Sequence, residues 1–569
     1  MSKTSKIFVT ILFSSLIFFG FKIWIITQVV EQPALNAYQS SVNTNYNNNE
    51  SDSDNYISAN QYKINVLHYY MNFDLYPSKK NLAGDVLITG LILDKSIKQI
   101  DLNFYDNMKI SKLELNGKQV FYNESGTKLT IPLDSAVTDT FKIRIVYNGT
   151  PKRMGFSSFV FGEINGKSCV YNLSEPEYAS TWFPCNDIPS DKALLDMKIT
   201  SDSSEVSASN GKLISISTKG SRRTYYWRTI YPISTYLICL YSSDYVNFSD
   251  KYISQDKADT MAIEYYVFPK QLKDARTDFQ EIPQMIDFFA KKFGEYPFIK
   301  EKYGMAEFLW NLGAMETQTL TGVGFSFIGG KQFFNDVYAH ELSHHWFGDA
   351  VGPETWKDIW LNEGFATYCE ALYAEHKGGP GALQSSMMSK FQDNFKGTVY
   401  NPDDLFSNTV YDKGAWILQM LRHQVGDSTF FRILRSYFSE YEYKNATTKD
   451  FEGVCEKVSG ENLSKFFDEW VFNGTGIINL NYDWKAEKYN NSYLISMNLK
   501  QTQKGYDTYY FPLDVKIQFA DHSSIIKTFQ VDKRQKTIEF KVEKKPIEIN
   551  LDPGNWLLAE IQKNRQSSE

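Results

Sequence analysis

The chain has 569 residues, of which 42% are hydrophobic and 22% charged, a composition typical of globular proteins with several domains. Its formal net charge of −7, with no Lys/Arg-rich run, argues against nucleic-acid binding. The five cysteines lie far apart and form no CxxC pair, which argues against a disulfide framework and against a cysteine-ligated zinc.

The N-terminus carries a long apolar segment. Two lysines precede the run Ile7–Phe21, and after Lys22 apolar residues continue to Val30. The shorter run has the length of a signal-peptide core, whereas the longer one can span a bilayer if Lys22 snorkels. Because no A-x-A cleavage site follows, we favour an uncleaved membrane anchor over residues 1–30, with the bulk of the chain outside the cytoplasm.

An Asn/Ser-rich tract follows, and it predicts a flexible linker over residues 31–60. From residue 61 to 250 the pattern has period two, which predicts an N-terminal β-sandwich-like domain. In "FKIRIVY" the apolar residues that share one face are Phe141, Ile143, Ile145 and Tyr147.

Residues 251–475 predict a mainly helical domain. The apolar residues at helical spacing near its start are Phe279, Ile282, Met285, Ile286, Phe289 and Phe293. Gly294 follows them as a stop signal, and Thr447 with Asp450 fits a capping box further along.

Residues 476–569 return to strand periodicity and predict a short C-terminal β-sandwich. In "FPLDVKIQF" the alternating apolar residues are Phe511, Leu513, Val515, Ile517 and Phe519, and Pro512 favours an edge strand. We therefore expect a multidomain α+β protein, in which a mainly helical domain follows one β-domain and precedes another.

The stretch "HELSHHWFG" contains three of the seven histidines of the chain. His340 and His344 are four residues apart, so on a helix they project from one face, as the H-E-x-x-H zinc motif requires. Glu341 lies between them and can reach a water molecule at an open zinc position. His345 points about 100° away from His344, so we assign it to packing or to support of the ligands.

A catalytic zinc needs a third protein ligand. The metzincin pattern fails, because Phe347 and Ala350 occupy its Gly and third His positions. An acid on the following helix remains, and Glu363 in "WLNEGFATY" lies nineteen residues after His344. The alternative is that the two histidines are ordinary surface or core residues, which the N-E-G sequence at this spacing disfavours.

These residues resemble the M1 aminopeptidases, a branch of the gluzincin metallopeptidases. The resemblance covers nearly the whole ordered chain and rests on motifs in the family order: "STWFPCNDIPSDKA", "GAMETQTLTG", "HELSHHWFGDAV" with "WLNEGFATY", and "VYDKGAWILQML". It implies a thermolysin-like catalytic domain that holds one zinc ion per chain through His340, His344 and Glu363. It also implies that Glu341 is the general base on a zinc-bound water and that Tyr411 stabilises the oxyanion.

Removal of single N-terminal residues requires recognition of a free α-ammonium group, and carboxylates suit that task. The resemblance implies that Glu316 in "GAMET" and Glu175 bind the α-ammonium group of the substrate. Glu175 fits the family spacing better than Glu177. It further implies that the strand with Gly313, Ala314 and Met315 binds the peptide backbone, as an added strand does.

Two departures from the family pattern stand out. Thr317 replaces the Asn of the commoner G-A-M-E-N, which changes a group near the substrate and leaves the amine anchor intact. The sequence also ends after the short β-sandwich, so we expect no large helical C-terminal domain and a more open site.

The residues present disfavour three other functions. Epoxide hydrolysis on the same zinc depends on the helical C-terminal domain, and a non-catalytic peptide-binding protein would have lost zinc ligands that are present here. A serine hydrolase is disfavoured because "GFSFI" has Ile328 where the nucleophile elbow needs Gly. The sequence thus predicts an exported, membrane-anchored zinc aminopeptidase whose partners are peptides with a free N-terminus.

Overall fold

The computed structural model describes residues 56–133 and 139–564. They form two compact units. One contains the described residues up to Asp287 together with Phe298–Glu341, and the other contains Phe288–Pro297 and the described residues from Leu342 onward. The predicted anchor, residues 1–30, lies outside the described residues, as does the predicted linker up to residue 55. Within the described part of the chain, no helix is long and apolar enough to cross a membrane.

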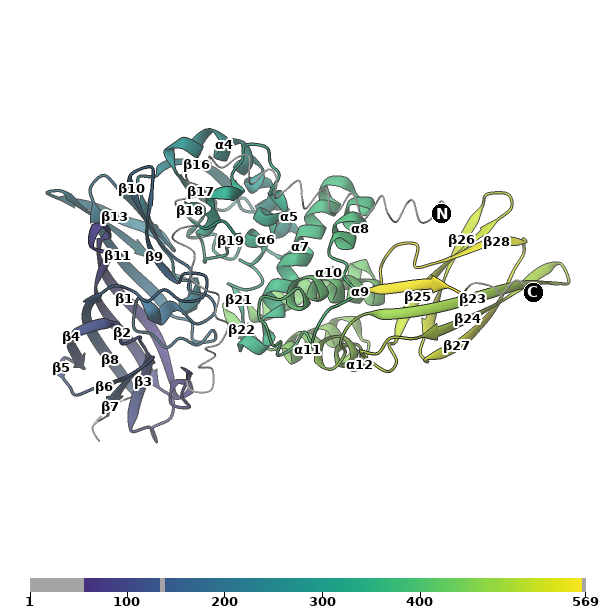
Figure 1. The fold of residues 1–569 in the computed structure, drawn as a ribbon, viewed down its shortest axis with the longest axis horizontal. Helices are drawn as coiled ribbons and strands as arrows, with labels where there is room; N and C mark the ends of the chain where they lie inside the picture. The colour runs from purple at the N-terminus through teal and green to yellow at the C-terminus, as the bar shows by residue number, and fades with distance from the viewer. Residues whose placement is uncertain (1–55, 134–138, 565–569) are drawn as a thin grey trace. The chain divides into compact units, whose positions relative to one another are not determined.

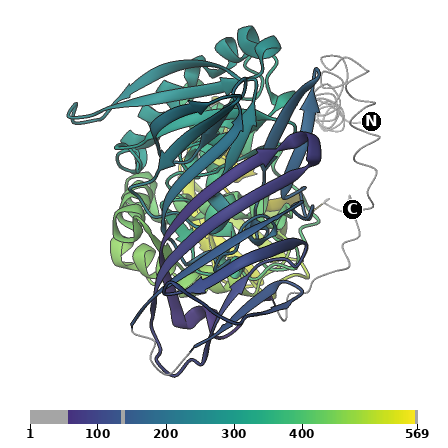
Figure 2. The ribbon, with the colours of Figure 1, turned by 90° about the vertical axis from the view of Figure 1, so that its left-hand side faces the viewer.

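The first unit is built mostly from β-sheets (Figures 1 and 2). Its eight-stranded sheet has the order β13-β14-β11-β1-β2-β8-β4-β5, with β1 Ile64–Tyr76, β2 Asn81–Ile92, β4 Met108–Leu115, β5 Lys118–Gln119, β8 Thr140–Gly149, β11 Leu194–Asp202, β13 Lys212–Lys219 and β14 Arg222–Arg228. Two smaller sheets comprise β9 Phe159–Ile164, β10 Lys167–Asn172, β12 Val206–Ser209 and β15 Leu240–Ser243, and β3 Gln99–Asn103, β6 Asn123–Ser125 and β7 Lys128–Pro132. The four apolar residues predicted to share a face of β8 are all buried, because alternate side chains of a strand point to one side.

A five-stranded sheet in the first unit contradicts part of the sequence-based expectation. Helices were expected to dominate from residue 251 onward, but strands recur up to residue 324. The sheet has the order β16-β17-β18-β20-β19, with β16 Val246–Ile253, β17 Thr260–Val267, β18 Lys302–Phe308, β19 Ala314–Met315 and β20 Thr321–Gly324. All seven residues of β18 are buried, so this strand lacks the polar alternation by which a half-exposed strand is recognised.

Helices α4 (Leu272–Asp278), α5 (Ile282–Phe293) and α6 (Asn335–Ser343) accompany this sheet in the sequence. The apolar residues that were predicted at helical spacing are all buried, Phe279 in the 3-10 turn Phe279–Glu281 and the others in α5. Helix α5 ends before Gly294, where the backbone φ is +128°. The remaining helices are α7 Trp360–Gly378, α8 Pro380–Ser389, α9 Gly414–Val425, α10 Asp427–Tyr441, α11 Thr448–Ser459 and α12 Ser464–Phe467, with π-helical turns at Thr409–Lys413 and Asp468–Phe472. Strands β21 (Val351–Pro353) and β22 (Lys444–Ala446) pair in parallel. The capping box of Thr447 and Asp450 is present at the start of α11.

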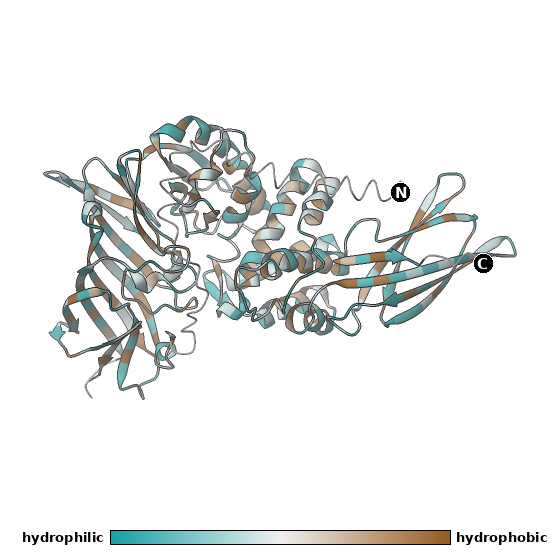
Figure 3. Cartoon of the chain, viewed as in Figure 1, coloured by the Kyte–Doolittle hydropathy of each residue, from teal (hydrophilic) through white to brown (hydrophobic). Residues whose placement is uncertain are grey.

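The C-terminal strands form two sheets, along which hydrophilic and hydrophobic residues alternate (Figure 3). They are β27-β24-β23-β29 and β26-β25-β28, with β23 Ile478–Tyr489, β24 Ser492–Gln501, β25 Phe511–Phe519, β26 Ser524–Val531, β27 Gln535–Val542, β28 Pro546–Leu551 and β29 Ala559–Lys563. The edge-strand prediction for Pro512 is wrong, because β25 is the central strand. Strand β28 pairs with β25 only from Val515 onward, so one side of β25 has no strand partner at Pro512, and a residue without a backbone N–H is tolerated at such a position.

The predicted fold class is confirmed: a β-rich N-terminal part, a mainly helical part and C-terminal β-sheets follow one another along the chain. The domain boundaries proposed from the sequence stay predictions. The five cysteines are all buried, and none forms a disulfide bond in the structure.

Glu301 offers a test of the packing of the first unit. Burial raises the pKa of its carboxyl to about 7, against hydrogen bonds from the backbone N–H groups of Ile230 and Tyr231 that favour the ionised form. A raised folded-state pKa stabilises the fold most below the ordinary value of about 4.5, and this contribution is lost as the pH rises through about 7. Between pH 5 and pH 8, the ionisation of Glu301 should lower the free energy of unfolding of the wild type by about 2–3 kcal/mol. We expect this part of the pH dependence to be absent in Glu301→Gln.

Thermal and urea unfolding of the two proteins across that pH range measures the difference. The relevant quantity is the slope with pH, because the new amide N–H₂ shifts stability by a similar amount at every pH. Glu543→Gln, which changes an exposed carboxylate, is the matched control. Parallel pH profiles for Glu301→Gln and the wild type would contradict the raised pKa.

Candidate functional site

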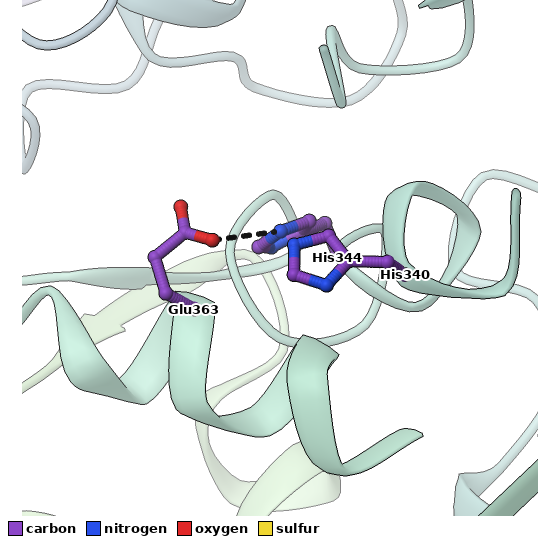
Figure 4. A group of neighbouring side chains, drawn as sticks. All are labelled: His340, His344 and Glu363. Carbon is purple, nitrogen blue, oxygen red and sulfur yellow. Dashed lines mark ion pairs between the residues drawn. The ribbon is translucent and has the colours of Figure 1, made fainter. Parts of the chain in front are cut away.

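The candidate metal site is built around the end of helix α6. His340 and Glu341 lie within the helix, and His344 follows its last residue, Ser343. Donor atoms of His340, His344 and Glu363 all lie within 4.8 Å of one another (Figure 4). His344 Nε2 is 3.4 Å from Glu363 Oε2, and both side chains are buried.

This spacing fits a zinc ion. Zinc binds imidazole nitrogen and carboxylate oxygen at about 2.0–2.2 Å in tetrahedral geometry, which separates neighbouring donor atoms by about 3.3–3.5 Å. Two imidazoles and one carboxylate are also a donor set that catalytic zinc sites use, with a fourth position left open. The three residues therefore suit a zinc ion in both distance and chemistry.

The backbone after α6 orients His344. Its Nδ1 lies 3.2 Å from the carbonyl oxygen of Phe347, so a proton on Nδ1 is donated there and Nε2 is left as the metal-binding atom. Gly348 has φ of +142°, and a Cβ at this position would lie 3.0 Å from His344 Nδ1. A glycine therefore allows the chain to pass close to the imidazole ring.

Glu363 lies in the first turn of α7, where the partial positive charge of a helix N-terminus favours a carboxylate. The start of this helix is held in place from the side: Asp358 accepts hydrogen bonds from the backbone N–H and the hydroxyl of Thr448, and Trp360 Nε1 donates to the Thr448 hydroxyl. The turn that carries Glu363 is thereby fixed to the start of α11.

His345 lies apart from the three donor residues. Its Nδ1 is 2.7 Å from the hydroxyl of Tyr296, and its Nε2 is 3.8 Å from a carboxylate oxygen of Asp349. His345 is completely buried. It is not among the residues that could hold a metal ion together in the described part of the chain. Of the two roles expected for His345, these contacts favour packing over support of the ligands.

Tyr411 lies on the π-helical turn Thr409–Lys413, which leads into α9. π-Helical turns occur frequently at functional sites. A Cβ on Gly364 would lie 2.9 Å from Gly414 Cα and 3.3 Å from the carbonyl oxygen of Val410. The turn that carries Tyr411 therefore packs closely against the helix that carries Glu363, and the glycines of N-E-G and D-K-G allow that contact.

Glu175 and Glu316 lie together in the first unit. Both carboxylates are buried, at 5% and 3% exposure, and oxygen atoms of the two side chains are within 4.8 Å of each other. Two buried acids at this distance repel each other when both are ionised, so the pair favours a cation between them. A protonated primary amine fits that requirement.

Tyr241 is a neighbour of this region that sequence reasoning missed. Its hydroxyl is 3.4 Å from the Thr317 hydroxyl, and burial, followed by the nearby Cys239, raises its pKa well above the ordinary value. Glu316 and Glu341 raise the pKa further, so the phenol stays protonated. The Thr317 hydroxyl donates to the carbonyl of Leu320 and closes a turn. Among 37 tyrosines, no sequence signal singles out Tyr241.

Strand β19, Ala314–Met315, is an end strand of the five-stranded sheet and pairs with β20 (Figure 1). The carbonyl of Gly313 accepts a hydrogen bond from Gly324 N. Because backbone groups of successive strand residues point to opposite sides, those of Ala314 face the outer edge. Of the two residues expected to offer backbone groups, Ala314 is therefore the better placed.

Comparisons with known proteins identify the family of the chain. Residues 278–470 match the family model described as the peptidase family M1 domain, and residues 65–237 match the peptidase M1 N-terminal domain. A probable aminopeptidase 1 from Sulfurisphaera tokodaii is 25% identical over 78% of this chain. The chain spans 56% of the length of that relative, and 40% and 37% of two further curated relatives.

Solved structures give the same result. An M1 zinc metallopeptidase mutant from Deinococcus radiodurans, bound to a Tyr-Ser-Ala substrate, is 25% identical with a TM-score of 0.62 over 72% of this chain and 94% of its own. Legionella pneumophila aminopeptidase A shares the fold, with a TM-score of 0.78 at 19% identity over 89% of this chain and 60% of its own. With both M1 domains matched in sequence and in fold, the chain belongs to peptidase family M1.

Proposed function

We propose that the protein is a zinc-dependent aminopeptidase that hydrolyses single residues from the free N-terminus of peptides. The observation that carries the proposal is the presence of two kinds of group: a two-histidine, one-carboxylate donor set that suits zinc, and two further buried carboxylates, Glu175 and Glu316, that suit an ammonium group. The first supports hydrolysis, and the second restricts it to substrates with a free amine.

His340, His344 and Glu363 hold the zinc ion. When bound, zinc supplies a Lewis acid that polarises the scissile carbonyl and lowers the pKa of water. Glu341, adjacent to His340 on α6, takes the proton of the attacking water and delivers it to the leaving amine. The Tyr411 phenol donates a hydrogen bond to the oxyanion of the tetrahedral intermediate.

Substrate orientation follows from the other residues. Glu175 and Glu316 bind the α-ammonium group, which stops the peptide after one residue. The outer edge of β19 offers the backbone N–H and C=O of Ala314 to the peptide backbone, in the way an added strand is bound. The Deinococcus relative, whose structure contains a Tyr-Ser-Ala substrate, supports a peptide as the ligand class.

A panel of fluorogenic amino-acid amides, each with a free and an acetylated amine, tests the proposal. We expect acetylation to lower kcat/KM by at least about 100-fold, because it removes the charge that the buried carboxylates pair with. Glu316→Gln should reduce the ratio of kcat/KM between free and acetylated substrates. A chelator should abolish activity until zinc is restored. Equal cleavage of acetylated amides would identify an endopeptidase, and zinc binding without any cleavage would favour a peptide-binding protein.

We further propose that residues 1–30 anchor the protein in a membrane with the catalytic part outside the cytoplasm. The apolar run with its preceding lysines supports this topology. In cell fractionation, the full chain should stay with membranes after a high-salt wash, and a protein that begins at residue 58 should be released. Protease added to intact cells should digest the catalytic part. A full chain found in the cytosolic fraction would overturn the proposal.

A further inference from the structure

The loop before β19, residues 309–313, carries an apolar surface that the chemistry proposed above leaves without a role. Leu312 is 64% exposed, and Trp310 is half-buried with its ring 5.6 Å from that of Phe156. A pair of partly exposed aromatic rings, with an exposed leucine two residues further along the same loop, is the kind of surface that contacts an apolar ligand. We call Phe156, Trp310 and Leu312 the aromatic shelf.

The backbone that carries Trp310 is held by contacts within the first unit. The hydroxyl of Tyr171 donates to the carbonyl of Leu309, and Trp310 N donates to the carbonyl of Phe308. A Cβ on Gly324 would lie 2.2 Å from the Trp310 carbonyl oxygen, so β20 also packs directly against the loop. A side chain of a ligand would therefore meet a preformed surface.

The position of the amine site fixes how a peptide reaches the shelf. Glu316 follows the C-terminal end of β19, so a peptide whose amine binds there runs back along the outer edge of β19, antiparallel to it. Its first residue then lies opposite Met315, its second opposite Ala314 and its third opposite Gly313. The outward backbone groups of Ala314 make the second residue the hydrogen-bonded one.

This register brings the third residue to the shelf. Residues directly opposite in an antiparallel pair have their side chains on the same face, and these are closest at positions without hydrogen bonds. A Cβ on Gly313 would lie 3.4 Å from the Trp310 ring. The face of Gly313 on which the third side chain falls is thus the face that Trp310 covers, and Gly313 has no side chain to fill the space.

We propose that the aromatic shelf is a specificity-determining subsite that selects a bulky apolar or aromatic side chain at the third residue of the substrate. The inference rests on the proposed aminopeptidase function and adds a preference to it. Partial burial of such a side chain should raise kcat/KM by about five- to tenfold relative to a small polar one.

The experiment compares peptides that differ only at one position. Ala-Ala-Phe and Ala-Ala-Ser probe the third residue, Ala-Phe-Ala and Ala-Ser-Ala probe the second, and a fluorogenic alanine amide ends before the shelf. We expect the wild type to prefer Phe over Ser about five- to tenfold at the third position. Leu312→Ser and Trp310→Ser should reduce that preference to less than about twofold and leave kcat/KM for the alanine amide unchanged.

Leu312→Ser keeps the test valid if Trp310→Ser disturbs the loop, because Leu312 is largely exposed. Phe121→Ser, at a side chain that is 94% exposed, is the matched control and should keep the preference. A wild type that cleaves the amide but is indifferent to the third residue would overturn the inference alone, as would a preference located at the second residue. A wild type that cleaves neither amide nor peptide would instead overturn the proposed function.

Discussion

Replacing Glu341 by Gln should lower kcat/KM for free amino-acid amides by about 10²–10⁴-fold, the range over which general acid–base catalysis contributes. Glutamine has nearly the shape of glutamate but cannot accept a proton at neutral pH, so water loses its base. Glu341 is 7% exposed and adjacent to His340 on α6, and the three donor atoms near it are unchanged by the substitution. We therefore expect the variant to bind one zinc ion per chain.

Steady-state kinetics and metal analysis on the same protein samples separate the two effects. Glu487→Gln, at an exposed residue of β23, controls for loss of a surface carboxylate. A Glu341→Gln variant with nearly full activity would mean that another group takes the proton. A variant that has lost its zinc would mean that Glu341 contributes to the metal site.

Local sequence spacing accounts for much of the candidate site. His340, Glu341 and His344 are within five residues, so helix geometry alone places the two imidazoles on one face. Glu363 follows on the next α-helix, α7, after the connection over residues 344–359, and the structure brings its carboxylate to the same place. Short sequence separation is why these residues could be proposed from the motif and elementary geometry.

The amine site could not be derived in this way. Glu175 and Glu316 are far apart in the sequence, and either acid would read as an ordinary surface residue without the family resemblance. Their proximity depends on the packing of long-range elements, which no local pattern records. The same holds for Tyr241, whose place beside Thr317 follows from the contact of two sheets.

The fold shows a similar division. Strands with one polar face, such as β8 and β25, were recognised by their alternation, and α5 by its apolar spacing. Strand β18 is buried on both faces and gave no alternation, so the five-stranded sheet that carries β19 was missed. The prediction that Pro512 marks an edge strand was wrong because the place of a strand in a sheet depends on which other strands pair with it, and the sequence of the strand itself does not record them.

Replacing Glu363 by Gln should weaken zinc binding by at least about 100-fold, more than the 10–100-fold loss typical when only a supporting residue is changed. The carboxylate supplies the negative charge of the donor set, whereas a neutral amide oxygen is a poor zinc ligand, and two imidazoles remain. Zinc should raise the melting temperature of the wild type, since it binds the folded chain, and should do so far less in the variant.

Competition with a chromogenic chelator gives the zinc Kd, and thermal unfolding with and without zinc gives the stabilisation. His345→Gln is the sharpest control, because His345 neighbours His344 in the sequence but contacts Tyr296 and Asp349. We expect that variant to keep its zinc affinity while its folded state is less stable, since a buried hydrogen bond to Tyr296 is altered. Unchanged zinc affinity in Glu363→Gln would exclude Glu363 as a ligand, and a loss in His345→Gln equal to that in Glu363→Gln would show that the measurement reports unfolding of the site and not ligation.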